Sequence, residues 1–338
     1  MLAERLTAQM LAGGPARDPV AVAERLLAIQ AQDPRGARLA VRARTTGLAA
    51  ADVDRALTED RSLVITWLNR GTLHLVRSED YPWLQALTTP PLQAGNARRL
   101  AQEGASPADA DRGVAEIERA LADEGPLTRK QLRDRLDAAG VPTAGQAMVH
   151  LLMLASLRGL VVRGPMIGKQ HALVLVRDWL GEPKRFDRQA ALGELARRYL
   201  IGHGPADEHD LAKWAGLPLR DARAGLEAVA SELRVRKDGL VDLRRRGRAG
   251  TLPPPRLLGA FEPLLLGWRS RDQIVGTHAK AVASGGLFRP IALVRGRAVG
   301  VWRIQEGRPE LEPFRRLAAG EASALAADAE DVVRFLGL

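Results

Sequence analysis

Residues 128–176 decide the fold, and their sequence is TRKQLRDRLDAAGVPTAGQAMVHLLMLASLRGLVVRGPMIGKQHALVLV. Thr128 with Gln131 is the signature of a capping box, in which each side chain bonds the backbone amide of the other, so a helix begins here. Gly140 ends that helix, because glycine adopts the left-handed conformation that commonly closes a helix. A second and more apolar helix is predicted over 146–158.

A β-hairpin is predicted directly after these two helices. Residues 161–163 and 171–176 are rich in valine and leucine, as strands are, and they flank the glycine-rich loop 164–169. Lys169 lies at the tip of this loop. Two helices followed by a hairpin are the helix-turn-helix and wing of a winged helix.

The N-terminal part of the chain predicts a similar arrangement. A helix that begins at Pro19 is expected to stop near Gln30, because Pro34 disfavours the helical conformation at the residue before it. Residues 30–33 then form an extended exit segment. Residues 63–77 are expected to form two strands around the turn Asn69-Arg70-Gly71.

A third copy and a different C-terminal region complete the chain. The third copy combines a long helix through Tyr199, helices over 208–215 and 219–233, and a hairpin around Asp238-Gly239. Beyond a proline-rich linker, residues 257–338 are expected to be rich in strands and to end in a helix.

These patterns together predict an α+β protein with three tandem winged helices and a C-terminal β-rich domain. The three units share no strict residue repeat, so the repetition lies in their architecture. The expected domain ranges are 1–100, 101–185, 186–250 and 251–338.

Composition narrows the class of protein further. The chain has 338 residues, of which 46% are hydrophobic and 27% charged, and these are ordinary values for globular proteins. It has no apolar run near the ~20 residues that span a bilayer, and residues 1–14 lack the apolar core of a secretory signal, which predicts a cytoplasmic protein. The absence of cysteine excludes disulfides, thiolate nucleophiles and cysteine-ligated zinc.

The net charge of +10 favours a polyanionic partner such as nucleic acid. Only six of the 50 basic residues are lysine, and a GC-rich coding bias is the alternative explanation for so much arginine. The sequence contains no phosphate-binding P-loop, no dinucleotide-binding glycine motif after a strand, no HExxH and no GxSxG. We therefore expect neither a cofactor nor a metal.

The extended segment Gln30-Ala31-Gln32-Asp33 carries one group of candidate site residues. Residues two apart face the same way on an extended backbone, so Gln30 and Gln32 can act on one target. A glutamine amide cannot act as a general base, but it donates and accepts hydrogen bonds and so suits the orientation of a water or a base edge. Asp33 is the nearest ionisable group. Taken alone, this motif is also typical of a surface loop or a helix cap.

The segment Arg70-Gly71-Thr72-Leu73-His74 carries the second group. Thr72 and His74 alternate with Leu73 and Leu75, so a polar face that contains His74 can line a cleft. The alternative is a half-buried strand with a hydrogen-bonded histidine.

Both motifs, together with residues 257–275 and 286–302, resemble the AlkZ/YcaQ family of bacterial DNA glycosylases. The resemblance spans nearly the whole chain. It implies three winged helices around a C-terminal β domain, and the excision of N7-alkylated purines that include bulky natural-product adducts and interstrand crosslinks. Gln30-Ala31-Gln32 matches the Q-x-Q of the AlkZ branch. Asn69 departs from the methionine that often precedes the R-G-T-L-H motif.

The resemblance implies that Gln30 and Gln32, with Asp33 as a further contributor, are catalytic. Alkylation at guanine N7 makes the base a cationic leaving group, so amide dipoles that hold a water and stabilise a developing sugar cation suffice. The sequence places no lysine near the motif to form a Schiff base, which favours a monofunctional enzyme that leaves an abasic site.

DNA contacts are expected from the wings and from the C-terminal region. A hairpin is expected within residues 264–274, like the C-terminal hairpin with which the family contacts DNA, and it would present an aromatic side chain among cations. For Trp268 the alternative is core packing. The expected DNA-binding residues are Arg70, His74, Arg77, Lys169, Trp268, Arg269 and Arg271, and the arginines 244–246 end the third wing.

The expected partner is double-stranded DNA that contains an alkylated purine, without an obligate protein partner and with the protein as a monomer. The competing class is a non-catalytic winged-helix protein, such as a transcription regulator or a drug-sequestering resistance protein. Residues 146–158 argue against a regulator, because this helix is largely apolar and expected to be packed rather than to present base-reading side chains.

Overall fold

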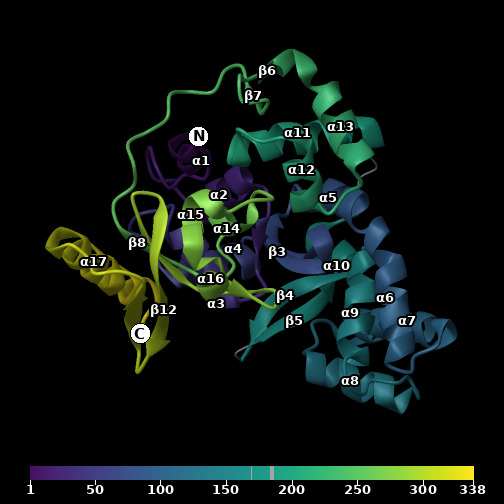
Figure 1. The fold of residues 1–338 in the computed structure, drawn as a ribbon. Coiled ribbons are helices and arrows are strands. Elements are labelled where there is room, and N and C mark those ends of the chain that lie inside the picture. Colours follow the sequence, from purple (N-terminus) through teal and green to yellow (C-terminus); the bar gives the residue numbers. More distant parts are fainter. Residues whose placement is uncertain (169, 183–185) are drawn as a thin grey trace. The chain divides into compact units, whose positions relative to one another are not determined.

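Helices and antiparallel strands are mixed along the whole chain in the computed structural model, which describes residues 1–168, 170–182 and 186–338 (Figure 1). The chain forms two compact units. Unit 1 comprises residues 1–54 and 188–338, and unit 2 comprises residues 55–187. Among the described helices, none combines the length and the apolar character that crossing a membrane requires.

Unit 2 is built from one sheet and a group of helices. The helices that lie fully within it are α5 (Tyr81–Thr88), α6 (Pro90–Gln102), α7 (Pro107–Glu124), α8 (Arg129–Ala138), α9 (Ala147–Leu157) and α10 (Val176–Leu180). The predicted capping box opens α8, because the Thr128 and Gln131 side chains each bond the backbone amide of the other residue.

The strands of the first two predicted wings join in a single sheet. β2 (Leu63–Leu68) pairs antiparallel with β3 (Thr72–Arg77), and β4 (Val161–Ile167) pairs antiparallel with β5 (Gln170–Leu175). A bridge between Ile65 and Arg163 connects the two hairpins in the order β3-β2-β4-β5. Both hairpins were predicted from the sequence, whereas their union was not.

The core of unit 2 packs helices α7, α8 and α9 against the second hairpin. Helix α9 contributes Met148, Leu151, Leu152 and Ala155, all fully or nearly fully buried. The expectation that this helix is packed is therefore confirmed. A helix buried in this way cannot lie in a DNA groove as a recognition helix does.

Unit 1 begins with α1 (Leu2–Ala8), α2 (Pro19–Leu26), β1 (Ile29–Gln30) and α3 (Pro34–Arg42), and α4 (Ala50–Thr58) crosses into unit 2. After residue 187 it continues with α11 (Arg188–His203), α12 (Glu208–Ala215) and α13 (Leu219–Ala228). The hairpin of β6 (Leu233–Val235) and β7 (Val241–Leu243) follows these helices, as predicted.

The C-terminal region is a four-stranded antiparallel sheet flanked by a long helix. Its strands lie in the order β13 (Arg308–Pro313), β12 (Arg297–Gln305), β11 (Ile291–Val294) and β8 (Arg256–Leu258). Helix α17 (Ala319–Leu336) packs against β8 and β13 (Figure 1). The predicted strands around Arg295-Gly296 and the closing helix are thus confirmed.

Residues 264–274 differ from the prediction. They form no hairpin but two one-turn helices, α14 (Pro263–Leu266) and α15 (Asp272–Val275), and α16 (Ala279–Val282) follows them. Glu262 begins α14, because its carboxylate accepts a hydrogen bond from the Leu264 amide. The small hairpin of this region lies later, between β9 (Ala283–Ser284) and β10 (Leu287–Phe288).

Candidate active site

The segment predicted to be extended is so only in part: Gln30 lies on a strand and Asp33 has extended dihedral angles, whereas the chain bends at Gln32. Helix α2 ends earlier than expected, at Leu26, and Leu27 then adopts a positive φ of 65°. Gln30 is the second residue of β1, and Asp33 is extended, with φ of −105° and ψ of 113°. β1 thus ends at Gln30, and the chain bends at Gln32 before Asp33 begins the cap of α3.

The two glutamines differ in exposure. Gln30 is 7% exposed, whereas Gln32 is exposed to solvent. Asp33 has a structural task, since its Oδ1 accepts a hydrogen bond from the Gly36 amide at 2.9 Å and so caps α3. The sequence analysis missed this helix, although Asp33-Pro34 repeats the Asp18-Pro19 pair that begins α2.

Helix α3 is anchored at its C-terminal end by two buried arginines. The Arg42 guanidinium bonds Asp328 at 2.7 Å and Asp331 at 2.8 Å, both on α17. Arg44, which is completely buried, pairs with the equally buried Glu262 at 2.5 Å. Because breaking a buried pair leaves an uncompensated charge, such contacts hold the helix in one position.

The second motif forms the turn between β2 and β3. Arg70 is the middle residue of this turn and has a positive φ of 58°, and Gly71 follows with φ of 74°. A Cβ on Gly71 would lie 3.0 Å from the Met153 side chain, so the turn packs closely on α9. Partial burial lowers the pKa of the Arg70 guanidinium.

His74 is not on an accessible polar face. It is 2% exposed, and its Nδ1 donates a hydrogen bond to the Thr72 carbonyl oxygen at 2.9 Å. Burial, and secondarily the charge of Arg70, lower the pKa of His74 to about 3, so its imidazole is neutral at physiological pH. The structure therefore agrees with a buried, hydrogen-bonded histidine rather than with a side chain that lines a cleft.

A further predicted DNA contact, Arg77, is the last residue of β3 in unit 2. The guanidinium of Arg77 bonds Asp80 through Nε at 2.8 Å, and Asp80 precedes the first residue of α5. Lys169, which was predicted at the tip of the second wing, lies outside the described residues.

Trp268 is a core residue and is not available for stacking on a base. It is 3% exposed, its indole N–H donates to the His203 carbonyl oxygen at 2.9 Å, and the Arg5 guanidinium lies 4.5 Å from the ring centre. The core-packing alternative is thus correct for this residue. Arg269 is exposed but bonds Asp207, and Arg271 donates to the Leu265 carbonyl oxygen.

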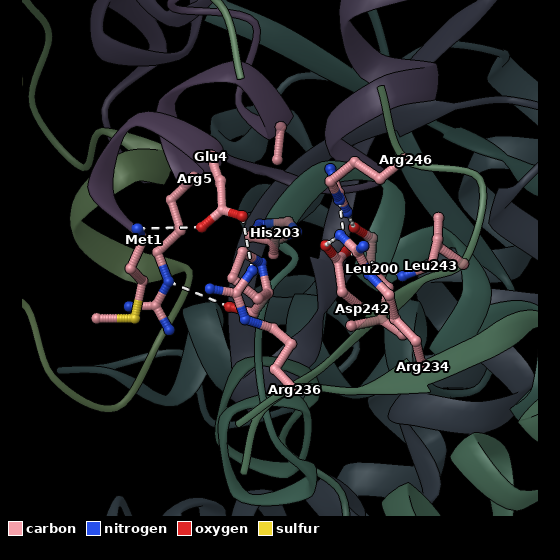
Figure 2. Close-up of polar contacts among 12 residues, drawn as sticks. Met1, Glu4, Arg5, Leu200, His203, Arg234, Arg236, Asp242, Leu243 and Arg246 are labelled. Carbon is pink, nitrogen blue, oxygen red and sulfur yellow. Dashed lines mark hydrogen bonds and ion pairs between the residues drawn. The ribbon is translucent and has the colours of Figure 1, made fainter. Parts of the chain in front are cut away.

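The arginines of the third wing divide into structural and exposed groups. Asp242 on β7 is completely buried between Arg234 and Arg246, and Arg246 also donates to the Leu200 carbonyl oxygen of α11 (Figure 2). Arg236 on the same hairpin pairs with Glu4 at 2.6 Å (Figure 2). Arg246 therefore stabilises the wing instead of facing DNA, whereas Arg245 remains exposed.

The strands β9 and β10 were not predicted, although Ser284-Gly285-Gly286, where they join, is typical of a turn. The turn of this hairpin is Gly285-Gly286, with φ of 57° and 82°, and Leu287 beside the turn is 67% exposed. The aromatic ring of Phe288 packs against Phe261 with 5.9 Å between ring centroids. The Gly-Gly pair after Ala283-Ser284 was the available signal for this turn.

Positive charge is concentrated in the region that includes this hairpin. Between residues 233 and 297, 14 side chains are Lys or Arg and four are Asp or Glu. This stretch therefore has a net charge of +10, the same as that of the whole chain. Several of the basic side chains are exposed, namely Lys237, Arg245, Arg248, Lys280, Arg295 and Arg297. An excess of basic residues along this stretch, several of them exposed, favours binding to a polyanion such as nucleic acid.

A fold of helices and small antiparallel hairpins with this concentration of positive charge is typical of proteins that act on DNA. The family described as DNA glycosylase AlkZ-like matches residues 23–335. The chain therefore belongs to the AlkZ-like family of DNA glycosylases, as the motifs predicted.

Relatives support this assignment over nearly the full length. The chain is 29% identical to an interstrand DNA cross-link repair glycosylase of Streptomyces sahachiroi, with 94% of this chain and 90% of the relative covered. It also superimposes on the solved structure of the DNA glycosylase AlkZ of Streptomyces sahachiroi with a TM-score of 0.82 and 26% identity. That comparison covers 100% of this chain and 96% of the other. The predicted combination of helices and sheets is confirmed.

Proposed function

We propose that this DNA glycosylase hydrolyses the N-glycosidic bond of N7-alkylguanine in double-stranded DNA and leaves an abasic site. The observation that carries the proposal is the segment 29–33, which presents the exposed Gln32 close in sequence to the buried Gln30. The name of the Streptomyces relative supports a wider substrate range that includes interstrand crosslinks.

The chemistry follows from the charge of the leaving group. A purine alkylated at N7 is cationic, so it departs without a strong general acid, and the barrier lies in the developing oxocarbenium character of the sugar. Gln30 and Gln32 stabilise that charge with their carbonyl dipoles and hold the attacking water. Asp33 caps α3 and so fixes the end of this segment, and a direct contribution of its carboxylate is a separate hypothesis, which the Asp33→Asn variant tests.

The product is expected to be an intact abasic site. A lyase step needs an amine nucleophile, and residues 1–129 contain no lysine. The chemistry of the segment is therefore hydrolysis by water, and strand cleavage should appear only after alkali.

DNA contact is assigned to the exposed basic side chains of residues 233–297 and to the β9–β10 hairpin. Leu287 at the turn of this hairpin can enter a distorted base step as an apolar wedge. We place here the C-terminal hairpin that the sequence analysis had expected at residues 264–274. Arg70 and Arg77 are proposed to add phosphate contacts from the first wing.

We also propose that the chain consists of three winged helices and a C-terminal β-rich domain. Their ranges are 1–100, 101–185 and 186–250 for the winged helices and 251–338 for the C-terminal domain. This organisation describes successive helix pairs and hairpins along the chain, and it is supported by the hairpins β2–β3, β4–β5 and β6–β7. The protein is proposed to act as a monomer.

The experiment is single-turnover cleavage of a duplex that contains one N7-alkylguanine, followed by alkali to reveal abasic sites. Wild type is compared with Gln30→Ala and Gln32→Ala, and spontaneous depurination without protein is the control. We expect excision well above the control for wild type, and its loss in both variants at unchanged DNA affinity.

The same experiment tests the competing class. If a methyl and a bulky adduct are both released at the spontaneous rate with wild type present, the protein does not excise these lesions. A DNA-binding or drug-sequestering protein is then the better description. Strand cleavage without alkali would contradict the monofunctional mechanism alone.

A further inference from the structure

The first turn of α3 makes a close backbone contact with residues 259–260. A Cβ placed on Gly36 would approach the Ala260 carbonyl oxygen far inside 3.0 Å and the Ala260 carbonyl carbon at 3.1 Å. The contact is reciprocal, because a Cβ on Gly259 would lie 2.9 Å from the Gly36 oxygen. Only glycine at position 36 allows the helix to lie this close to residues 259–260.

This contact is linked directly to the Gln30-x-Gln32 segment. The Gly36 amide is the group that Asp33 caps, and Asp33 is the residue next to Gln32. The opposite end of α3 is held by Arg42 through Asp328 and Asp331. A movement at Gly36 therefore cannot be absorbed by a free slide of the helix, and it is transmitted through the cap to the segment 29–33.

We propose that Gly36 is a positioning residue for Gln30 and Gln32, setting where the two amides lie relative to the scissile bond. The inference rests on the proposed catalytic role of these glutamines. Gly36 has no side chain and contacts no substrate, so it acts only through the placement of the segment. Displacements of about 1 Å remote from the reacting atoms are sufficient to slow an enzymatic reaction by about 100-fold.

The test is a graded series of glycine to alanine substitutions. Gly36→Ala introduces the most severe overlap, and Gly259→Ala introduces a milder overlap at the same contact. Gly320→Ala is the matched control, because Gly320 also lies in the first turn of a helix of unit 1 and a Cβ there meets no atom within 4 Å. None of the three glycines has a positive φ, so alanine is compatible with each local backbone.

The measured quantity is the single-turnover excision rate as a function of enzyme concentration. A partly unfolded variant has fewer active molecules, which raises the concentration needed for half-saturation but leaves the plateau rate unchanged. A misplaced segment lowers the plateau rate itself. We expect a plateau about 10- to 100-fold lower for Gly36→Ala, a smaller loss for Gly259→Ala and an unchanged plateau for Gly320→Ala.

Amide hydrogen exchange of residues 28–36 gives a second readout that does not depend on activity. We expect faster exchange there in Gly36→Ala and Gly259→Ala, with no change in Gly320→Ala. If the variant at position 36 does not fold, the comparison of Gly259→Ala with Gly320→Ala decides the question.

A wild-type plateau rate in a folded Gly36→Ala or Gly259→Ala protein would overturn the inference and leave the proposed function intact. Conversely, absent excision by wild type would refute the proposed function, while hydrogen exchange would still show whether Gly36 fixes the segment.

Discussion

Residues 29–33 and 69–74 are both short polar segments between regular elements, yet the fold uses them in different ways. The first leaves Gln32 exposed and caps the following helix with Asp33. The second buries His74 and places Arg70 in a tight turn with positive φ. A segment rich in polar residues therefore does not always form a ligand-binding surface.

The physical cause of the difference is the length of the flanking strands. β1 has only two residues, and after it the chain bends at Gln32 and caps α3 with Asp33, so Gln32 stays near solvent. β2 and β3 pair over six residues each, and their register places His74 opposite the buried Thr66. The first segment is suited to touching substrate, and the second to building the sheet.

The largest effect that would sharpen this comparison is the pH dependence of stability caused by His74. Its pKa is about 3 in the folded protein and near 6.5 in the unfolded chain, so the unfolded state binds the extra proton and stability falls as pH decreases. We expect a loss of about 2 kcal/mol between pH 6.5 and 5, and about 4–5 kcal/mol down to pH 3. Urea unfolding of wild type and His74→Gln at each pH measures it.

The control for this prediction is His209→Gln, which removes an exposed histidine from α12. The free energy of unfolding of His74→Gln should depend less on pH than that of wild type over this interval, and the control should follow wild type. Parallel curves for all three proteins would mean that His74 is accessible to protons, and the contrast between the two segments would be wrong.

The second largest expected effect is the loss of excision rate when Gln32 is replaced. Removing a dipole that stabilises a transition state costs about 100- to 1000-fold in rate, so Gln32→Ala should lower the single-turnover excision rate by at least 100-fold at unchanged DNA affinity. Gln32→Glu retains an oxygen at the same reach and should lose less. Equal losses in the two variants would contradict a role in holding water and stabilising a cation.

Local sequence patterns predicted most of the helices and hairpins, because helix capping and turn formation depend on a few neighbouring residues. Thr128 with Gln131 located α8, and the expected range 208–215 matches α12. The contacts that place the candidate segment 29–33 are of another kind. Arg44 meets Glu262 more than 200 residues away, and Gly36 meets Ala260 across a similar separation. A single sequence carries no signal for such pairs.

The same reasoning explains the errors in the candidate site. Trp268 among arginines suggested an exposed aromatic wedge, but it packs in a cluster with His203 and Trp214 that only the tertiary fold brings together. The extended conformation of Asp33 was predicted correctly because Pro34 constrains the residue before it, whereas the bend at Gln32 was not predicted.

Substitutions of Asp33 are expected to have a smaller effect, and they distinguish a role in helix capping from a role in catalysis. Asn caps a helix as well as Asp does, whereas Ala removes the cap at a cost of about 1 kcal/mol. We expect Asp33→Asn to keep stability and excision rate, and Asp33→Ala to lose about 1 kcal/mol in urea unfolding. A large loss of rate in Asp33→Asn, with stability intact, would instead assign its carboxylate to catalysis.

The smallest expected effect is that of Arg70→Asn, which tests whether residues 69–74 contact DNA. Asn tolerates positive φ, so Arg70→Asn should leave the stability of the β2–β3 turn nearly unchanged. If the guanidinium neutralises one phosphate, DNA affinity falls a few-fold and the slope of log affinity against log salt decreases by about 0.9. Binding measured between 50 and 200 mM salt distinguishes the cases. An unchanged slope would make residues 69–74 purely structural, because a charge that releases no counterion does not reach the DNA backbone.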